Sequence, residues 1–321
     1  MRRLKPNVFI VGAPKCGTTA LVEYLSSHPD FFVPALKEPG YFSVDYPGMR
    51  VIKEEADYLS LYAKAPASVS RLCDASVTYL MSECAISRIL EFQPDARFMV
   101  ILRNPLDLIA AEHSQMLVTG IEDQENLETA WELQHVRARG QYITPGCIEP
   151  KLLQYANTAS NGRHVQRLFN LAGRENVHIV IFDDFVEDTR KVYLEVLDFL
   201  GLQDDGRKEF PVINENRVRR SVLLTRLIHS QYSPLHHLKP LLKRKLEGLW
   251  YRIAATLYSL TGRKEPRGLI SPSLAARILH QMEEDTLLLE QLLGRSLQSW
   301  KTLPERHESK EVDFQSFADH R

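Results

Sequence analysis

The sequence predicts an α/β fold, in which a parallel sheet is flanked by helices on both faces and followed by a helical C-terminal extension. Short apolar runs rich in β-forming residues alternate with longer stretches whose apolar residues recur at helical spacing. Strands that are apolar throughout are typical of a parallel sheet, because helices cover both of its faces. The alternation of the two patterns therefore indicates βα units.

Four buried strands are expected, each a short run of β-forming or alternating residues: 7–11, 68–74, 98–102 and 176–185. Start and stop signals mark the helices, with Ser82 and Pro105 at beginnings and Gly173 and Gly201 at ends. The expected helices are 18–25, 54–63, 82–92, 105–119, 126–137, 152–171, 189–200 and 271–293.

The chain of 321 residues, 44% hydrophobic and 25% charged, is long enough to bury a sizeable core. We expect one domain over residues 1–305, with 235–300 as its helical C-terminal part, and a polar, disordered tail over 306–321. The formal net charge of −1 indicates no general attraction to nucleic acid, so no nucleic-acid partner is expected.

The cysteines and the apolar runs bear on cellular location. The four cysteines include no C-x-x-C pair, which indicates neither a disulfide framework nor a zinc site. No apolar stretch reaches the ~20 residues that cross a bilayer, and the apolar run behind the basic N-terminus is too short for a signal peptide. We therefore expect a cytoplasmic protein without a metal.

A tight loop over residues 12–17 joins the first strand to the first helix. Such a corner points free backbone N–H groups and the positive end of a helix dipole at one spot, where an anion binds. Lys15 adds a charge, and Thr18 and Thr19 add hydroxyl donors. The nucleotide-triphosphate P-loop reads Gly-x4-Gly-Lys-Ser/Thr. Here Thr18 stands in place of that lysine, so the fold is P-loop-like but the loop is of another kind.

A second corner follows the strand 98–102, which ends on Arg103, and Pro105 then suits the first turn of a helix. An arginine fork makes two charge-assisted bonds to one phosphate. A lone arginine at a strand end also forms salt bridges at a sheet edge. Its pairing with the Lys15 loop at the switch point of a parallel sheet favours a phosphate site.

The two corners resemble the phosphate-binding motifs of the PAPS-dependent sulfotransferases, in the branch that acts on carbohydrates and bacterial small molecules (PAPS is 3′-phosphoadenosine 5′-phosphosulfate). Pro-Lys-x-Gly-Thr-Thr at 14–19 resembles the 5′-phosphosulfate loop, and Arg-Asn-Pro at 103–105 resembles the motif that grips the 3′-phosphate. The resemblance spans roughly residues 6–300. It implies transfer of a sulfuryl group from PAPS to a hydroxyl, or in second place an amine, of a small-molecule or carbohydrate acceptor. The product is 3′-phosphoadenosine 5′-phosphate (PAP), and the family uses no metal.

The resemblance also implies binding residues. In the family a basic loop at the position of residues 214–221 closes over the 3′-phosphate, although a solvated basic face explains these arginines nearly as well. The implied PAPS-binding residues are Ala13, Pro14, Lys15, Cys16, Gly17, Thr18, Thr19, Arg103, Arg217, Arg219 and Arg220.

Two residues are candidates for the general base that the acceptor hydroxyl requires. Glu38 stands in a Lys-Glu-Pro segment whose glutamate is the proposed base in the family, and a loop carboxylate paired with Lys37 is the alternative. His113 is the reserve candidate, because some sulfotransferases use a histidine, although a lone helical histidine is more often structural. Lys15 is expected to stabilise the charge that grows during transfer.

The chain departs from the family pattern at two alanines. Ala75 stands where many carbohydrate enzymes carry an active-site lysine, and Ala111 stands where the family has a serine near the 3′-phosphate. Asp74 and Tyr79, in the same segment as Ala75, either bind the acceptor or close a turn. Residues 239–260 are basic and amphipathic, which suits a helix packed on the domain, contact with a second copy of the chain, or weak contact with a membrane surface.

Two other functions stay open. One is a P-loop kinase or NTPase with a displaced lysine, which ATP binding with Mg²⁺ and no response to PAPS would support. The other is a non-catalytic nucleotide-binding protein, in which the two alanines mark lost chemistry.

Overall fold

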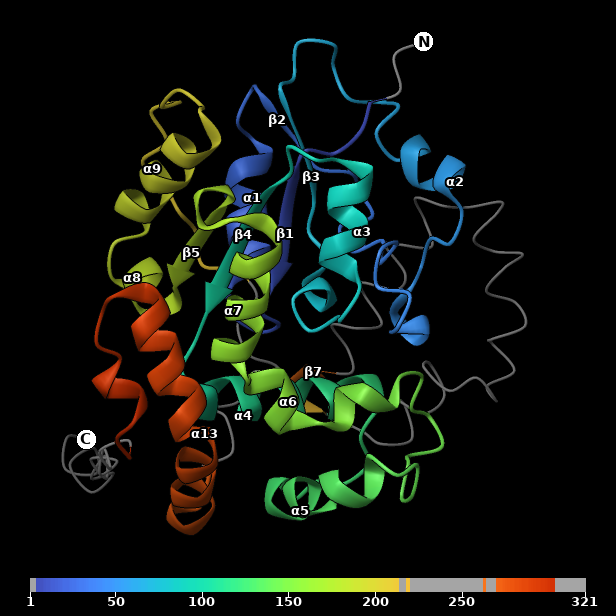
Figure 1. Ribbon diagram of the computed structural model, residues 1–321, viewed down its shortest axis with the longest axis vertical. Coiled ribbons are helices and arrows are strands. Elements are labelled where there is room, and N and C mark those ends of the chain that lie inside the picture. Colours follow the sequence, from blue (N-terminus) through green and yellow to red (C-terminus); the bar gives the residue numbers. More distant parts are fainter. Residues whose placement is uncertain (1–3, 214–217, 220–261, 264–269, 304–321) are drawn as a thin grey trace, which may run out of the picture.

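The computed structural model describes residues 4–213, 218–219, 262–263 and 270–303 (Figure 1). At its centre lies a five-stranded parallel sheet in the order β2-β3-β1-β4-β5. The strands are β1 (Val8–Gly12), β2 (Phe31–Phe32), β3 (Arg71–Asp74), β4 (Arg97–Leu102) and β5 (Val177–Ile181). Every residue of β1 is buried, as the apolar run requires. The predicted fold class is confirmed.

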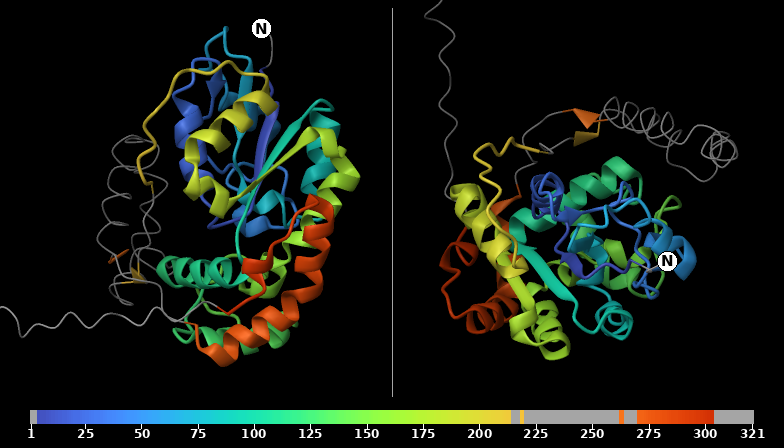
Figure 2. Two further views of the ribbon diagram at one scale, coloured as in Figure 1. Left: turned by 90° about the vertical axis from the view of Figure 1, so that its left-hand side faces the viewer. Right: turned by 90° about the horizontal axis from the view of Figure 1, so that it is seen from above.

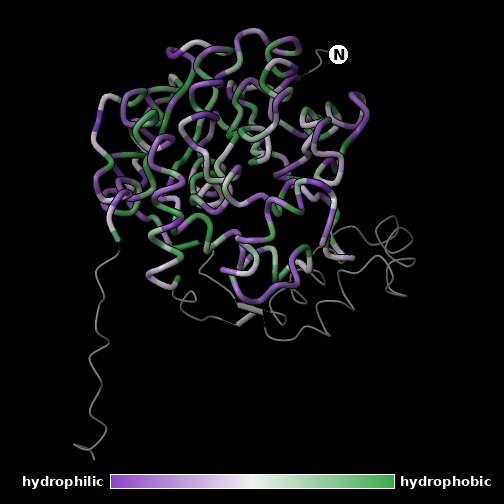
Figure 3. Tube along the Cα trace, turned by 60° about the horizontal axis from the view of Figure 1, so that its bottom comes forward, coloured by the Kyte–Doolittle hydropathy of each residue, from purple (hydrophilic) through white to green (hydrophobic). Residues whose placement is uncertain are grey.

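Helices cover both faces of the sheet (Figure 2). On one face lie α1 (Thr18–Ser26) and α9 (Thr189–Leu200), and on the other lie α3 (Ala85–Phe92) and α7 (Asn161–Ala172). Apolar segments concentrate in the middle layer and polar ones outside it (Figure 3). The remaining helices are α2 (Glu55–Ser60), α4 (Pro105–Thr119), α5 (Leu127–Arg137), α6 (Tyr155–Ala159), α8 (Phe182–Glu187) and α13 (Pro272–Leu293).

Short elements complete the described chain. The 3-10 helices are Pro47–Met49, Val77–Tyr79, Pro150–Leu153, Arg174–Asn176 and Gln298–Trp300. A separate antiparallel pair consists of β6 (Val218–Arg219) and β7 (Gly262–Arg263), and β6 lies beside α4. No helix among the described residues is both long enough and apolar enough to span a bilayer.

Helix α4, which carries much of the site, begins and ends as its sequence predicts. The Asn104 side chain accepts a hydrogen bond from the N–H of Leu106, and Pro105 is the first helical residue. Gly120 ends the helix with φ 76°, a left-handed conformation that glycine adopts without strain. These local signals fix the helix directly after β4, so that its first turn stands at the carboxyl edge of the sheet.

Several elements differ from the sequence-based expectation. The single helix expected over 152–171 is broken into a 3-10 turn, α6 and α7, because the backbone leaves the helical conformation at Gln154, with ψ 72°, and at Ser160, with ψ 61°. The Ser160 hydroxyl donates to the carbonyl of Ala156. Asp285 of α13 then caps the restarted helix by accepting from the N–H groups of Gly162 and Arg163. The fourth strand also stops at Ile181, where α8 begins, and the two-residue edge strand β2 was not expected.

Several expectations fall on residues that the structure does not describe. The basic segment 239–260, the tail from 306 to 321, Arg217 and Arg220 all lie outside the described residues. The final helix is α13, whose N-cap is the Ser271 hydroxyl, as the Ser-Pro signal predicts.

Candidate anion-binding and active site

The loop between β1 and α1 presents unsatisfied donors at the carboxyl edge of the sheet. Gly17 takes φ 88° as the N-cap of α1 and offers no side chain to the helix end. Among the described residues, the N–H groups of Thr18 and Thr19 have no backbone acceptor. A hydrogen bond joins the loop to the neighbouring strand β4, since the N–H of Ala13 donates to the carbonyl of Ile101 at 2.8 Å. This corner has the geometry of an anion site built from backbone and helix dipole.

The Lys15 amine extends from the loop towards helix α4. Its Nζ donates to Oε1 of Gln115 at 3.0 Å, and the residue has φ 58°. Ala13, Pro14 and Cys16 are buried beneath the loop, where the Cys16 thiol donates to the Pro14 carbonyl at 3.2 Å. Of the predicted loop residues, Lys15, Thr18 and Thr19 therefore carry polar side chains at this corner, although Thr18 is only 5% exposed, and Ala13, Pro14 and Cys16 shape the loop.

Arg103 lies at the end of the neighbouring strand, and only 9% of it is exposed. Its guanidinium stands 4.4 Å from the centre of the Phe182 ring, and its Nε and Nη2 donate to Oδ2 of Asp107 at 3.2 and 3.0 Å. The same ring faces the loop, since a Cβ added to Gly17 would lie 3.0 Å from it. The structure thus places the Lys15 loop and Arg103 against the same aromatic ring, at the switch point between β1 and β4.

Glu38 lies at the same edge of the sheet, on the loop that follows β2. Its carboxylate pairs with the Lys37 amine at 3.2 Å, and the two side chains are 41% and 21% exposed respectively. The same amine donates to the hydroxyls of Thr18 and Thr19 at 3.4 and 3.1 Å. The expected general base is therefore linked to the anion loop through a lysine, which sequence reasoning treated only as a neighbour of Glu38.

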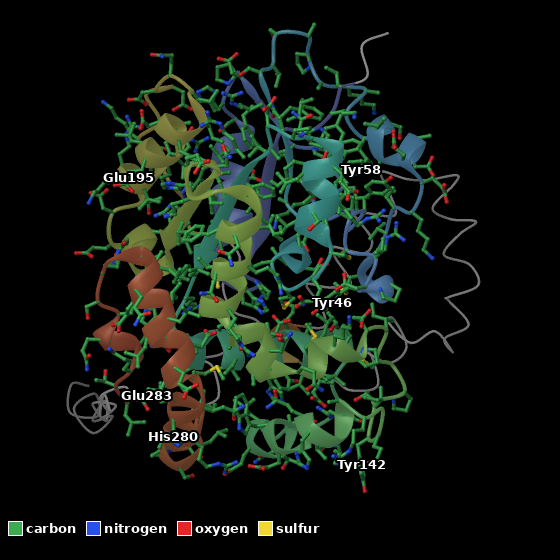
Figure 4. The ribbon with its side chains drawn as sticks, in the orientation of Figure 1. Tyr46, Tyr58, Tyr142, Glu195, His280 and Glu283 are labelled. Carbon is green, nitrogen blue, oxygen red and sulfur yellow. The ribbon has the colours of Figure 1, made fainter. Side chains whose placement is uncertain are left out.

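A buried polar network holds the loop that carries Glu38. The N–H of Gly40 donates to the Ser76 hydroxyl at 3.0 Å, and that hydroxyl donates to Asp74 at 2.7 Å. Asp74 also accepts from the hydroxyls of Tyr58 and Tyr79 at 2.8 and 2.9 Å (Tyr58 is labelled in Figure 4). Burial raises the pKa of Asp74 to about 6, against the lowering effect of these hydrogen bonds. Asp74 and Tyr79 thus close the turn after β3 in the interior.

His113 is occupied inside the protein. Its Nε2 donates to the carbonyl of Gln124 at 2.7 Å, and its ring meets the edge of Tyr155 at 5.8 Å. Burial lowers the pKa of the imidazole, so it is neutral at physiological pH. Ala111 is buried on the same helix and brings no polar group to the Arg103 corner.

Glu112 is a member of the site that sequence reasoning missed. Only 2% of it is exposed, and burial raises the pKa of its carboxyl to about 7. The charges that act on this pKa come from Lys15, which lowers it, and Glu38, which raises it. Glu112 also lies one helical turn before Gln115, the partner of Lys15. That spacing is a signal in the sequence, but only the fold reveals the burial.

The carboxylates after β5 serve the C-terminal segment. Asp183 accepts from the indole N–H of Trp300 at 3.1 Å, and Asp184 pairs with Arg295 at 2.5 Å. They hold the end of the described chain against α8. Among the described residues, no three His, Cys, Asp or Glu side chains come together as a metal site requires.

These features define a class of protein: an α/β protein in which a donor-rich loop and an arginine corner share one edge of a parallel sheet. The chain belongs to the sulfotransferase family, since the family profile described as "Sulfotransferase domain" matches residues 5–228.

Individual relatives agree with this family. Human heparan sulfate glucosamine 3-O-sulfotransferase 6 is 34% identical over 123 residues, which cover 36% of this chain and 32% of that protein. Human carbohydrate sulfotransferase 15 is 25% identical over 152 residues, covering 35% of this chain and 27% of that protein. The chain thus matches no more than about a third of the length of these relatives. A sulfotransferase structure from Alicyclobacillus acidocaldarius shares the fold, with a TM-score of 0.67, 23% identity, and coverage of 93% of this chain and 100% of that one.

Proposed function

We propose that this protein transfers a sulfuryl group from PAPS to a hydroxyl of a small-molecule or carbohydrate acceptor, with an amine as the second choice. The observation that carries the proposal is the shared Phe182 ring, which sets the Lys15 loop and Arg103 side by side. Two separate cationic corners suit a ligand with two separate anionic groups, as a 3′-phosphate and a 5′-phosphosulfate are. The named relatives support a carbohydrate acceptor.

The donor set fits the phosphosulfate end of such a ligand. The free N–H groups and the hydroxyls of Thr18 and Thr19, with the Lys15 amine, offer neutral and charged donors to the same anion. Because these donors are fixed before reaction, they stabilise charge that develops on sulfuryl and phosphate oxygens at no cost in reorganisation. PAPS supplies an activated sulfuryl group and a phosphate leaving group.

Arg103 holds the 3′-phosphate in this proposal. Arg219 lies in β6 beside α4 and is the described member of the basic loop proposed to close over the same phosphate. Asp107 keeps the Arg103 guanidinium in a fixed orientation through two of its nitrogens, which leaves the other donors for the ligand.

Glu38 acts as the general base. It is the partly exposed carboxylate of this edge, so an acceptor can reach it, and it takes the proton from the attacking hydroxyl as the new oxygen–sulfur bond forms. The reserve candidate His113 has its Nε2 engaged with Gln124, which favours Glu38. A cytoplasmic location, where PAPS would be available without transport, belongs to the same proposal.

A direct assay tests the function. Purified protein is incubated with radiolabelled PAPS and a panel of hydroxyl- and amine-bearing saccharides and metabolites, and labelled products are separated from PAPS. We expect at least one labelled acceptor, and calorimetric binding of PAP without Mg²⁺. Binding of ATP with Mg²⁺ and no binding of PAP would instead support a kinase or NTPase. Tight PAP binding with no transfer to any acceptor would support a non-catalytic nucleotide-binding protein.

A further inference from the structure

We propose that Lys37 is a second catalytic cation of this site, which contacts the transferred sulfuryl group and responds to the protonation of Glu38. The inference rests on the proposed sulfuryl transfer and adds a residue to it. Lys37 adjoins the expected base in sequence, yet its amine points away from solvent and onto the first turn of α1.

The Lys37 amine lies against the start of helix α1. Its contacts are the hydroxyls of Thr18 and Thr19, which flank the free N–H groups at the start of α1. In both contacts the ammonium donates and the hydroxyl oxygen accepts. Each hydroxyl therefore keeps its own hydrogen for an anion oxygen, and the ammonium polarises it towards that anion. An ammonium so close to these hydroxyls adds its charge to any group that they bind.

The backbone fixes this position. The N–H of Ala75 donates to the carbonyl of Lys37 at 3.3 Å, and the next turn of the loop is held by Ser76 through Gly40. Lys37 therefore starts from a point anchored on the corner after β3, and its side chain is only 21% exposed. Ala75 brings no charge to this corner. A surface lysine that merely neutralised Glu38 would need neither the anchor nor the two hydroxyls.

The contact with Glu38 makes the effect of the Lys37 charge change during the reaction. Before reaction the ammonium is divided between the Glu38 carboxylate and the anion loop. When the acceptor oxygen attacks sulfur, its proton passes to Glu38, and the bond from sulfur to the leaving phosphate oxygen breaks with its electron pair on that oxygen. Glu38 is then neutral and attracts the ammonium less. The charge of Lys37 becomes available to the sulfuryl and phosphate oxygens at the moment when their negative charge grows.

The test compares Lys37→Met and Lys37→Arg with Lys53→Met, which changes an exposed lysine of the same N-terminal region. Turnover is measured with PAPS and the acceptor identified for the wild type, and PAP affinity is measured by calorimetry. Removal of one preorganised donor costs about 10²–10³-fold in kcat. We expect a loss of that size in Lys37→Met, partial recovery in Lys37→Arg, and a much smaller loss of PAP affinity than of kcat, because PAP keeps the 5′-phosphate but has no sulfuryl group.

The possible results distinguish a failure of the Lys37 inference from a failure of the proposed function. If the wild type transfers sulfate and Lys37→Met does so at an undiminished rate, Lys37 is a surface partner of Glu38 and the inference is wrong. If PAP affinity falls as far as kcat/KM does, Lys37 serves the 5′-phosphate rather than the sulfuryl group, which also overturns it. Absence of transfer by the wild type removes the proposed function and this inference with it. Thermal unfolding of each variant checks that the fold is retained.

Discussion

Replacement of Glu112 by glutamine should stabilise the protein in a pH-dependent way. A carboxyl whose pKa is raised by folding binds its proton more tightly in the native state. Its contribution to stability is therefore complete below pH 4.5, the ordinary pKa, and is lost as the pH rises through about 7. The difference between these two pKa values corresponds to about 3 kcal/mol of unfolding free energy, at 1.36 kcal/mol per unit. Because Glu112 is 2% exposed, solvent screening reduces this figure little.

The expected gain of Glu112→Gln is thus up to about 3 kcal/mol at pH 8.5 and close to zero at pH 4.5. In thermal unfolding this gain corresponds to a midpoint roughly 6 °C higher at pH 8.5, at ~2 °C per kcal/mol for a chain of this size. Urea unfolding at both pH values measures it directly. Glu195→Gln, which changes an exposed residue of α9 labelled in Figure 4, is the matched control and should show no such difference. An equal effect of Glu112→Gln at the two pH values would refute the reasoning.

Three further predictions concern the neighbouring groups. Glu38→Gln should lower kcat by roughly 10²–10⁴, the usual contribution of a general base, and wild-type turnover in a steady-state assay would refute its role. Arg103→Ala should weaken PAP binding by roughly 10- to 100-fold, as expected for the loss of a charged hydrogen bond. Adenosine 5′-phosphosulfate, which lacks the 3′-phosphate, should bind both proteins equally in calorimetry. Asp74→Asn should lower the unfolding free energy by roughly 2–3 kcal/mol, because one amide oxygen cannot accept both from Ser76 and from the two tyrosines. Urea unfolding at pH 7 measures that loss, and an unchanged midpoint would show that the network is dispensable.

The sequence was most informative where local chemistry determines structure. The apolar runs of β1 and β4, the loop that follows β1, and the Asn104–Pro105 start of α4 each follow from neighbouring residues alone. The sequence therefore locates both corners at the carboxyl edge of the sheet, and their role in phosphate binding stays a prediction. The break at Ser160 was missed because the Asp285 carboxylate that caps α7 arrives from a helix far along the chain.

The same distinction applies to the site. Motif reasoning found Glu38 and treated Lys37 as its neighbour, because the sequence does not reveal which hydroxyls a four-carbon side chain will reach. His113 is the reserve candidate because some sulfotransferases use a histidine, whereas no motif in the sequence points to Glu112. In the folded protein, burial makes His113 harder to protonate and Glu112 harder to ionise, so the glutamate is the residue of this pair that titrates near neutrality.

The aromatic side chain between Gly17 and Arg103 has a consequence for selectivity. Because an aromatic ring is rigid, and both the Arg103 guanidinium and the Gly17 backbone lie against this one, we expect it to limit how closely the two cationic corners can approach each other. Under the proposed function, we expect a nucleotide with all of its phosphates in one contiguous chain to satisfy one corner at a time. We expect a nucleotide charged at both ends of its ribose to satisfy the two corners together, so that ligands are discriminated by the interval between their charges as well as by how many charges they carry.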